Sequence, residues 1–190
     1  MHIFGHFRTI THHRHLVIGH CFKCGIPWQG LRHDLSKYAP AEFFPGCKYY
    51  TGTRSPNEGE RKDKGFSSAW MHHKGRNKHH FEYWNDVSLE THRYAPVKMP
   101  YRYLVEMFCD RVAASKTYGG KKYTDDYALN YFLGGHGRSQ MHPDTAAELE
   151  RLLTMLRDRG EKETFAYVKK TVKEMKKTPF AYQGGGKEQG

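Results

Sequence analysis

The sequence has no long hydrophobic run. Apolar stretches such as Leu16-Val17-Ile18 are far shorter than the roughly 20 residues that a helix needs to cross a bilayer, so we expect no membrane span. The first 22 residues hold six histidines and no uninterrupted apolar segment, which argues against a signal peptide. We therefore expect a cytoplasmic protein.

Acidic residues are also scarce. The chain has 20 Asp and Glu against 31 Lys and Arg, which gives a formal net charge of +11. A field of that sign favours anionic partners such as phosphorylated small molecules, nucleic acid or an acidic surface, although a solvated basic surface would look the same. The lysines between positions 169 and 177 alternate with apolar residues, which predicts the exposed face of a helix rather than a nucleic-acid-binding arm.

Cysteines are few. Of the four, Cys21 and Cys24 have the spacing of zinc and redox sites, but no second pair with this spacing completes a four-ligand zinc site. We therefore expect buried, reduced cysteines.

The chain does have enough rings to build a core. Hydrophobic residues make up only 37% of the sequence, but aromatic residues reach 14%, which excludes a disordered chain. The length of 190 residues suits one domain. We find no alternating apolar and polar segment long enough for a sheet. The sequence therefore predicts an all-α, single-domain helical bundle over residues 1–180, followed by a disordered tail over 181–190.

Apolar spacing and capping residues predict where the helices lie. The predicted helices span residues 9–25, 27–37, 41–50, 66–73, 77–90, 100–118, 125–133, 143–159 and 161–177. The polar segment 51–65, which contains glycine and proline, is predicted to be a loop.

The unusual feature is the number of histidines, which is 14. Histidines used in clusters are typical of metal binding or proton handling. The candidate ligands on successive predicted helices are His13, His33, Asp34, His73, His79, His80 and Asp110. Their wide separation excludes a zinc finger and suits a bundle whose helices each project one or two ligands inward. Imidazole and carboxylate together suit one or two divalent transition metals (Mn, Fe, Ni, Co or Zn).

Each of these residues also has a simpler interpretation. His13 could be an exposed helix residue like its neighbours His12 and His15, and Asp110 could pair with an arginine. The histidine pairs at 72–73 and 79–80 could form a basic surface. Taken together, the residues favour a metal site, because the composition requires a use for so many histidines.

This ordered set resembles the HD-domain superfamily of metal-dependent phosphohydrolases. Residues 31–37 (LRHDLSK) are similar to the signature of that superfamily, His13 to its first ligand, and Asp110 to its closing aspartate. The additional histidines resemble the branches that bind two metals, and either His79 or His80 could be the ligand. Segments 33–43, 69–84 and 106–115 more closely resemble an uncharacterised HD-like family of bacterial and phage proteins, over roughly residues 10–155.

Other residues near these motifs could serve the chemistry. Lys37 and Arg76 could neutralise phosphate charge, and Glu82 or Glu106 could orient a ligand imidazole. Asn77 could cap a helix. The segment 69–84 also contains Trp70, Tyr83 and Trp84, which we expect to pack around the site, with a base-stacking platform as the alternative.

The resemblance implies a metal-dependent phosphohydrolase acting on a nucleotide or related phosphoester, with Asp34, Lys37 and Arg76 in catalytic roles. In this interpretation the metal activates a water molecule for attack on phosphorus. One alternative is an HD-type di-iron oxygenase, which uses the same ligand types. A second alternative is a basic, non-enzymatic module that binds nucleic acid or protein. The presence of Asp34 and Asp110 among the histidines argues against this module, because a nucleic-acid binder has no need of them.

Overall fold

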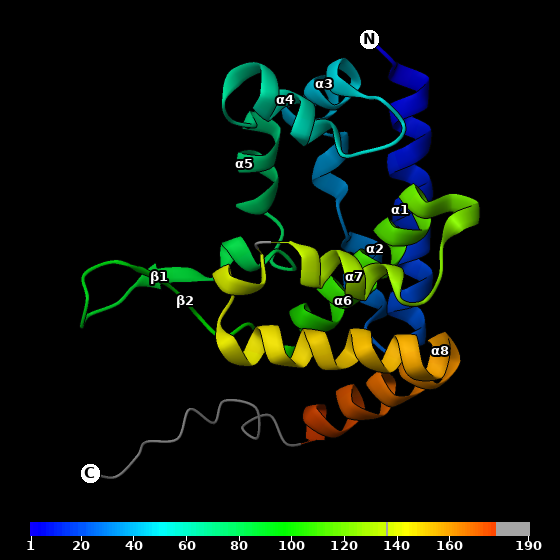
Figure 1. Ribbon diagram of the computed structural model, residues 1–190, viewed down its shortest axis with the longest axis vertical. Helices are drawn as coiled ribbons and strands as arrows, with labels where there is room; N and C mark the ends of the chain where they lie inside the picture. Colours follow the sequence, from blue (N-terminus) through cyan, green and yellow to red (C-terminus); the bar gives the residue numbers. More distant parts are fainter. Residues whose placement is uncertain (136, 178–190) are drawn as a thin grey trace.

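A computed structural model describes residues 1–135 and 137–177, and Figure 1 shows that helices dominate it. The α-helices are α1 (Ile3–Lys23), α2 (Pro27–Arg32), α3 (Pro40–Tyr49), α4 (Pro56–Lys64), α5 (Ser68–Lys74), α6 (Tyr101–Gly119), α7 (Tyr127–Gly134) and α8 (Pro143–Lys177). Short 3-10 helices are η1 (Leu35–Tyr38), η2 (Phe81–Tyr83), η3 (Gly120–Lys122) and η4 (Arg138–Gln140). The described chain thus forms the single all-α domain that the sequence predicts.

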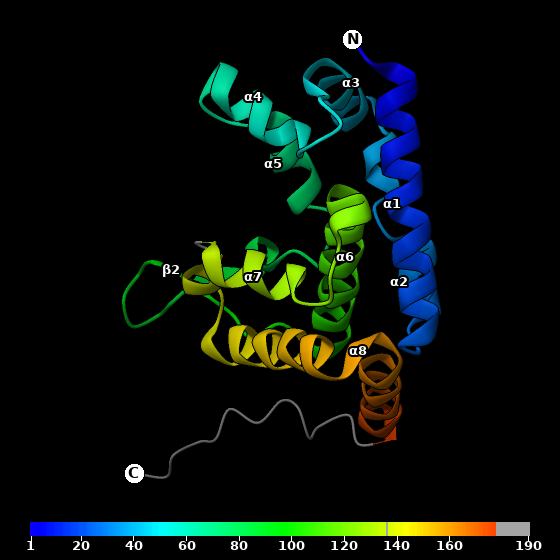
Figure 2. The ribbon, with the colours of Figure 1, turned by 45° about the vertical axis from the view of Figure 1, so that its right-hand side comes forward.

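The longest straight element, α1, joins two groups of helices. Figure 2 shows α6 running alongside α1 in the opposite direction, and α1 also contacts α2, α3 and α8. Helices α3, α4 and α5 pack together beside the N-terminal half of α1, whereas α2, α7 and α8 surround its C-terminal half and α6. We call these the upper and lower groups, following their places in Figure 1.

The hydrophobic core lies mainly in the lower group. Its fully buried members include Val17 of α1, Phe108 of α6 and Leu153 of α8. The buried face of α1 follows the three- and four-residue spacing of an amphipathic helix. That face consists of His6, Ile10, His13, Val17, His20 and Cys21. Half of these residues are histidines. The side of α1 that faces the hydrophobic core in the lower group therefore faces a more polar interior beside the upper group.

Most helix predictions are confirmed within a few residues. Helix α1 begins at Ile3, earlier than the predicted residue 9. Helix α8 contains Gly160 at φ 73°, which breaks it into the two predicted segments, 143–159 and 161–177. The predicted tail over 181–190 lies outside the described residues. None of the described helices is long and apolar enough to cross a membrane.

The predicted helix over 77–90 is wrong. This segment contains a turn, η2, and the strand β1 (Asn85–Val87), which pairs antiparallel with β2 (Tyr94–Pro96). Asp86 lies opposite Ala95, and the backbone N–H of Val97 donates to the carbonyl of Trp84 at 2.8 Å. Every residue of β1 is exposed, so the last part of the segment has no buried face that would favour a helix. The hairpin projects from the bundle in Figure 1 and leaves the all-α architecture unchanged.

The predicted loop over 51–65 is partly wrong, because it contains α4. Pro56 occupies the first turn of this helix, and Glu58 is also in that turn. Three basic residues, Arg61, Lys62 and Lys64, lie in the last turn, and Gly65 at φ 80° ends the helix. The sequence does contain helix signals here, which the polar composition obscured. They are a proline at the start, charges that complement the helix dipole, and a glycine at the end.

Candidate metal centre

Residues from α1 and α6 form one side of the centre. His13 of α1 places its Nε2 atom 2.9 Å from Oδ1 of Asp110, which lies on the facing helix α6. The same carboxylate oxygen is 3.5 Å from Nε2 of His33. The antiparallel packing of α1 on α6 therefore brings together residues that are almost 100 positions apart in the sequence.

The chain turns sharply at His33 and Asp34. Helix α2 ends at Arg32 rather than continuing to the predicted residue 37, and Asp34 adopts a left-handed backbone conformation with φ 54°. Arg14 holds the end of α2, since its Nε donates to the carbonyl of His33 at 3.1 Å. Aspartate tolerates this conformation better than most residues. The turn directs the Asp34 side chain into the protein, where it is only 2% exposed.

The two oxygens of Asp34 face different histidines. Oδ2 lies 3.3 Å from Nε2 of His33. Oδ1 lies 3.2 Å from Nε2 of His73 and 3.4 Å from Nε2 of His79. One carboxylate thus lies between two groups of imidazole nitrogens.

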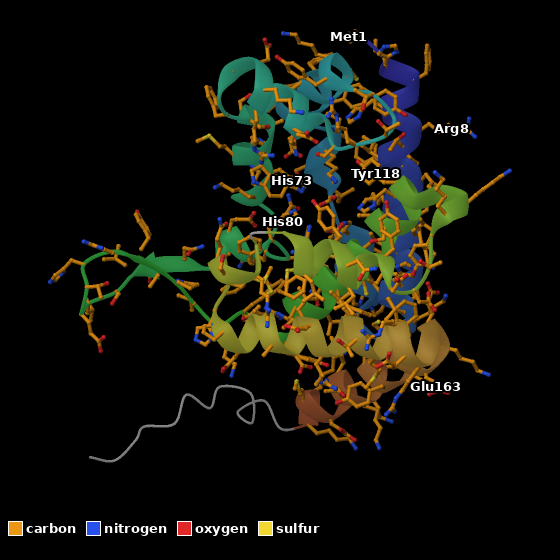
Figure 3. The ribbon with its side chains drawn as sticks, viewed as in Figure 1. Met1, Arg8, His73, His80, Tyr118 and Glu163 are labelled. Carbon is orange, nitrogen blue, oxygen red and sulfur yellow. The ribbon has the colours of Figure 1, made fainter. Side chains whose placement is uncertain are left out.

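His80 belongs to the same cluster. Figure 3 shows His73 at the end of α5 with His80 close below it. One ligand atom from each of Asp34, His73, His79 and His80 lies within 4.8 Å of the others. A second set with the same property consists of His13, His33, Asp34 and Asp110. All seven predicted metal ligands are therefore brought together, and both His79 and His80 are included.

Several atoms that face the interior of the cluster are buried and make no regular hydrogen bond among the described residues. They are Nε2 of His13, His33, His73, His79 and His80 and both oxygens of Asp34. Their nearest polar neighbours are mostly one another, apart from Asp110 beside His13 and Lys37 beside Asp34. Burying polar atoms without partners is costly, and native proteins rarely do so without a reason. A bound cation would satisfy all of these atoms at once, so the residues present fit one or two metal ions.

Carboxylates outside the cluster hold the histidine rings. Oε1 of Glu106 lies 3.1 Å from Nδ1 of His33 and 3.2 Å from Nδ1 of His79. Gln29 donates from Nε2 to the other oxygen of Glu106 at 2.9 Å. Because a carboxylate can only accept, each Nδ1 carries a proton, which leaves Nε2 as the nitrogen that can bind a cation. Glu106 is thus one of the two orienting residues that the sequence suggested.

Glu42 acts in the same way on α5. Its two oxygens lie 2.7 Å from Nδ1 of His73 and 2.7 Å from Nδ1 of His72. The sequence analysis missed Glu42, because a single glutamate within a short predicted helix carries no signal of burial. The other suggested orienting residue, Glu82, is partly buried near the hairpin and has no described contact with the ligand histidines.

Electrostatics keep the carboxylates ionised despite their burial. Burial favours the neutral acid, but the charges of His33 and Lys37 outweigh it and hold the pKa of Asp34 well below its usual range. Burial likewise opposes ionisation of Glu106, but hydrogen bonds from His33 and His79 lower its pKa to about 2. Burial, with the neighbouring His79 and His73, holds the pKa of His80 well below its ordinary value. The ionised carboxylates and the neutral His80 suit metal coordination. The same carboxylates raise the pKa of His33 and His73 despite burial, so a metal ion would displace a proton from each of these two rings.

The remaining residues with suggested roles differ in their placement. Nζ of Lys37 lies 2.7 Å from Oδ2 of Asp34, beside the cluster. Arg76 is exposed, and the contact that the structure gives it is with the carbonyl of His72 at 3.2 Å. Asn77 starts no helix, so its suggested capping role is corrected: it donates from Nδ2 to the carbonyl of His73 at 2.8 Å and to Oγ of Ser36 at 2.9 Å.

The cysteine expectation holds within the described chain, but the aromatic expectation holds only in part, because Tyr83 is exposed and packs against Trp84. Trp70 packs its ring edge-on against His80, with 4.6 Å between the centroids. Trp84 packs against the hydrophobic core. All four cysteines are free and buried, with 3.6 Å between the sulfur atoms of Cys24 and Cys109.

A small cavity reaches the centre from the upper group. Its volume is about 60 Å³, and its lining includes His73 and Lys37. Both of these residues contact Asp34, so a group in the cavity would lie directly beside the cluster.

The fold and the site define an all-helical protein with a buried histidine–carboxylate cluster that could hold a metal ion. The chain belongs to a family of unknown function (DUF5662), whose model matches residues 2–155. The match includes every residue of the cluster and confirms the predicted membership of an uncharacterised family. No curated protein and no solved structure matches the chain.

Proposed function

We propose that this protein is a metal-dependent phosphohydrolase of the HD type, acting on a phosphoester at a centre of two divalent metal ions. The observation that carries the proposal is the position of Asp34, whose Oδ1 atom faces Nε2 of His73 and His79 and whose Oδ2 atom faces Nε2 of His33. A carboxylate in that position is suited to bridge two cations.

Each metal would have its own ligands. His13, His33 and Asp110 would hold one ion and His73, His79 and His80 the other, with Asp34 shared between them. Mixed nitrogen and oxygen ligands suit Mn, Fe, Co, Ni and Zn ions. When bound, such ions supply Lewis acidity, which lowers the pKa of water and polarises phosphoryl oxygens.

The protein's own groups would assist the transfer of the phosphoryl group. In the reaction, the oxygen of a water molecule forms a bond to phosphorus, the ester P–O bond breaks, and the leaving oxygen takes up a proton from the water. The products are inorganic phosphate and an alcohol. Lys37, with its ammonium group beside Asp34, would stabilise charge on the phosphoryl oxygens. Arg76 would have to turn from its contact with His72 to take part.

The first experiment is to measure metal content by elemental analysis of protein purified without an affinity tag. We expect about two equivalents of metal per chain and a large loss in the His33→Ala and Asp34→Ala variants. His12→Ala is the matched control, because His12 is next to His13 in sequence but exposed on the outer face of α1. It should retain the full metal content.

Activity assays then separate the hydrolase from its rivals. The metal-loaded protein should release inorganic phosphate from a panel of phosphoesters. Two equivalents of iron together with dioxygen consumption, and no phosphate release, would identify an oxygenase instead. Absence of bound metal, with no stabilisation by added Mn²⁺, Zn²⁺ or Fe²⁺, would refute both enzymatic functions and leave a binding module.

A further inference from the structure

The cavity beside the centre has a defined polar lining. It lies between α1, α3 and α5, with the start of α4 and the end of α6 completing its wall. The polar groups that face it include Thr9, Lys37, Tyr50, Asn57, His73 and Tyr118. The carboxylate of Glu42 also borders it, with its oxygens already in contact with His72 and His73. Figure 3 shows His73 and Tyr118 at a similar level in the molecule, on different helices. Anything that occupies this cavity contacts both the upper group of helices and the end of α6.

The cavity has a cationic end and a hydroxyl-rich wall. Lys37 supplies the positive charge next to Asp34. On the wall, the hydroxyl groups of Thr9 and Tyr50 lie 2.8 Å apart and hydrogen-bond to each other. Oδ1 of Asn57 accepts from Oγ of Ser67 at 3.4 Å, which orients the Asn57 amide. A phosphate beside Lys37 with a short hydroxylated chain along this wall would match the lining.

The volume of the cavity limits what fits. It measures about 60 Å³, whereas pockets that bury molecules of drug or nucleotide size span about 300–1,000 Å³. A phosphate with a few carbon and oxygen atoms is compatible with the smaller volume, but a nucleoside is not. Tyr118 borders the cavity and is 39% exposed, so its ring stands between the cavity and solvent.

We infer that the substrate is a small phosphomonoester, with a short polar alcohol as its leaving group, rather than a nucleotide. Its phosphate lies at the cavity end nearest Lys37, and Tyr118 contacts it and limits its size. This inference rests on the proposed phosphohydrolase function. Hydrolysis would release inorganic phosphate and the short alcohol.

The test compares two probes on the Mn²⁺-loaded protein. We expect kcat/KM for glycerol phosphate to exceed that for adenosine monophosphate by at least tenfold. Binding of inorganic phosphate, followed by isothermal titration, provides a readout that does not depend on turnover. In Tyr118→Phe the affinity for inorganic phosphate should fall about tenfold, because a hydrogen bond to a charged group is lost.

Tyr118→Ala tests the size limit. Removing the ring should raise kcat/KM for adenosine monophosphate relative to glycerol phosphate, an effect that a purely structural role would not produce. The matched control is Tyr94→Phe together with Tyr94→Ala, since Tyr94 is 81% exposed on the projecting hairpin. Both control variants should behave as the unmodified protein.

The failures of the two proposals can be told apart. Equal or better hydrolysis of adenosine monophosphate by the unmodified protein would overturn the small-substrate inference and leave the phosphohydrolase intact. Unchanged phosphate affinity in Tyr118→Phe, with loss in Lys37→Gln, would overturn the role of Tyr118. No phosphate release from any ester by fully metal-loaded protein would overturn the proposed function, and this inference with it.

Discussion

At the scale of single residues, Glu106 links the two ligand sets. Its Oε1 atom contacts Nδ1 of His33, in one set, and Nδ1 of His79, in the other. Glu42 contacts only one ligand histidine, His73, together with the neighbouring His72. The two glutamates should therefore differ in how many metal ions depend on them.

We predict that Glu106→Gln weakens the binding of both metal ions, whereas Glu42→Gln weakens the binding of only one. Loss of a carboxylate that orients a ligand imidazole typically lowers metal affinity by about 10- to 100-fold. In a competition titration against a chromogenic chelator, one of the two metal-binding steps should be weaker in Glu42→Gln, and both should be weaker in Glu106→Gln. Glu163→Gln is the control, because Figure 3 shows Glu163 on α8, far from His73 and His80. A single weakened step in both variants would show that Glu106 does not link the sites.

The ligands themselves could be predicted from residue types, whereas their surroundings could not. Adjacent pairs such as His33-Asp34 and His79-His80 are visible in the sequence, and a metal site explains why one chain has so many histidines. The roles of Glu42 and Ser36 depend on how α3 and η1 pack against α5, which the sequence does not encode locally. The choice between His79 and His80 likewise needed the turn that follows α5, which directs both toward Asp34.

At the scale of elements, Glu60 of α4 holds the start of α5. Its carboxylate accepts from the hydroxyl groups of Ser67 and Ser68, each at 2.7 Å, and from the backbone N–H of Ala69 at 3.3 Å. Lys64 lies 3.1 Å from the same group. Helix α5, which carries His73 in its last turn, is therefore anchored at its first turn by one buried charge.

This anchor makes a pH-dependent prediction. Burial would raise the pKa of Glu60, but the hydrogen bonds from Ser68, Ser67 and Lys64 outweigh it and lower the pKa to about 2. A carboxyl whose pKa is lower in the folded state stabilises the fold above its unfolded pKa, near 4.5, and loses that stabilisation as pH falls toward 2.

We expect Glu60→Gln to lower the free energy of unfolding by about 2 kcal/mol at pH 7, and by progressively less below pH 4.5. Urea denaturation of both proteins between pH 7 and pH 3 measures the difference. Glu163→Gln, at an exposed position, should show a negligible change throughout. A deficit that stays constant over this range would show that the ionised carboxylate is not the source of the stabilisation.

The elements were predictable where an apolar stripe marks them. Helix α6 buries Leu104, Phe108 and Val112, which recur every four residues, and lies within a residue of its predicted bounds. The hairpin of β1 and β2 has no such stripe, because exposed residues of β1 pair through their backbone with the exposed and half-buried residues of β2. Helix α4 buries little besides Glu60, so hydrophobic periodicity could not reveal it.

At the scale of the whole molecule, the centre lies between two groups of helices with different interiors. The lower group has the hydrophobic core, whereas the polar contacts that reach the upper group from the rest of the chain include Asp34 with His73 and Glu106 with His79, which follows α5. Metal ions would join His13 and Asp110, on the long antiparallel pair, to His73 at the end of α5. Metal binding should therefore stabilise the upper group in particular.

We predict that removing metal with a chelator lowers the melting temperature by about 5–10 °C, when compared with protein at a metal concentration 100-fold above its dissociation constant. Hydrogen exchange should show the largest loss of protection in α3, α4 and α5 rather than in α8. Asp34→Ala should be insensitive to the chelator. A uniform loss of protection over the whole chain would show that the two groups unfold as one unit.

The histidines that remain outside the centre bear on how the protein reaches its native state. His2, His12, His15 and His92 are exposed. Two of them, His12 and His15, lie on either side of the ligand His13 in α1. In an unfolded chain, His12, His13 and His15 are neighbours that can chelate a transition metal before α1 forms. Metal present from the start should therefore slow refolding by trapping incorrect ligand sets, whereas the same metal added afterwards should only stabilise. An order-of-addition experiment with Zn²⁺, following refolding by tryptophan fluorescence, would reveal this kinetic competition, and His12→Ala with His15→Ala should relieve it.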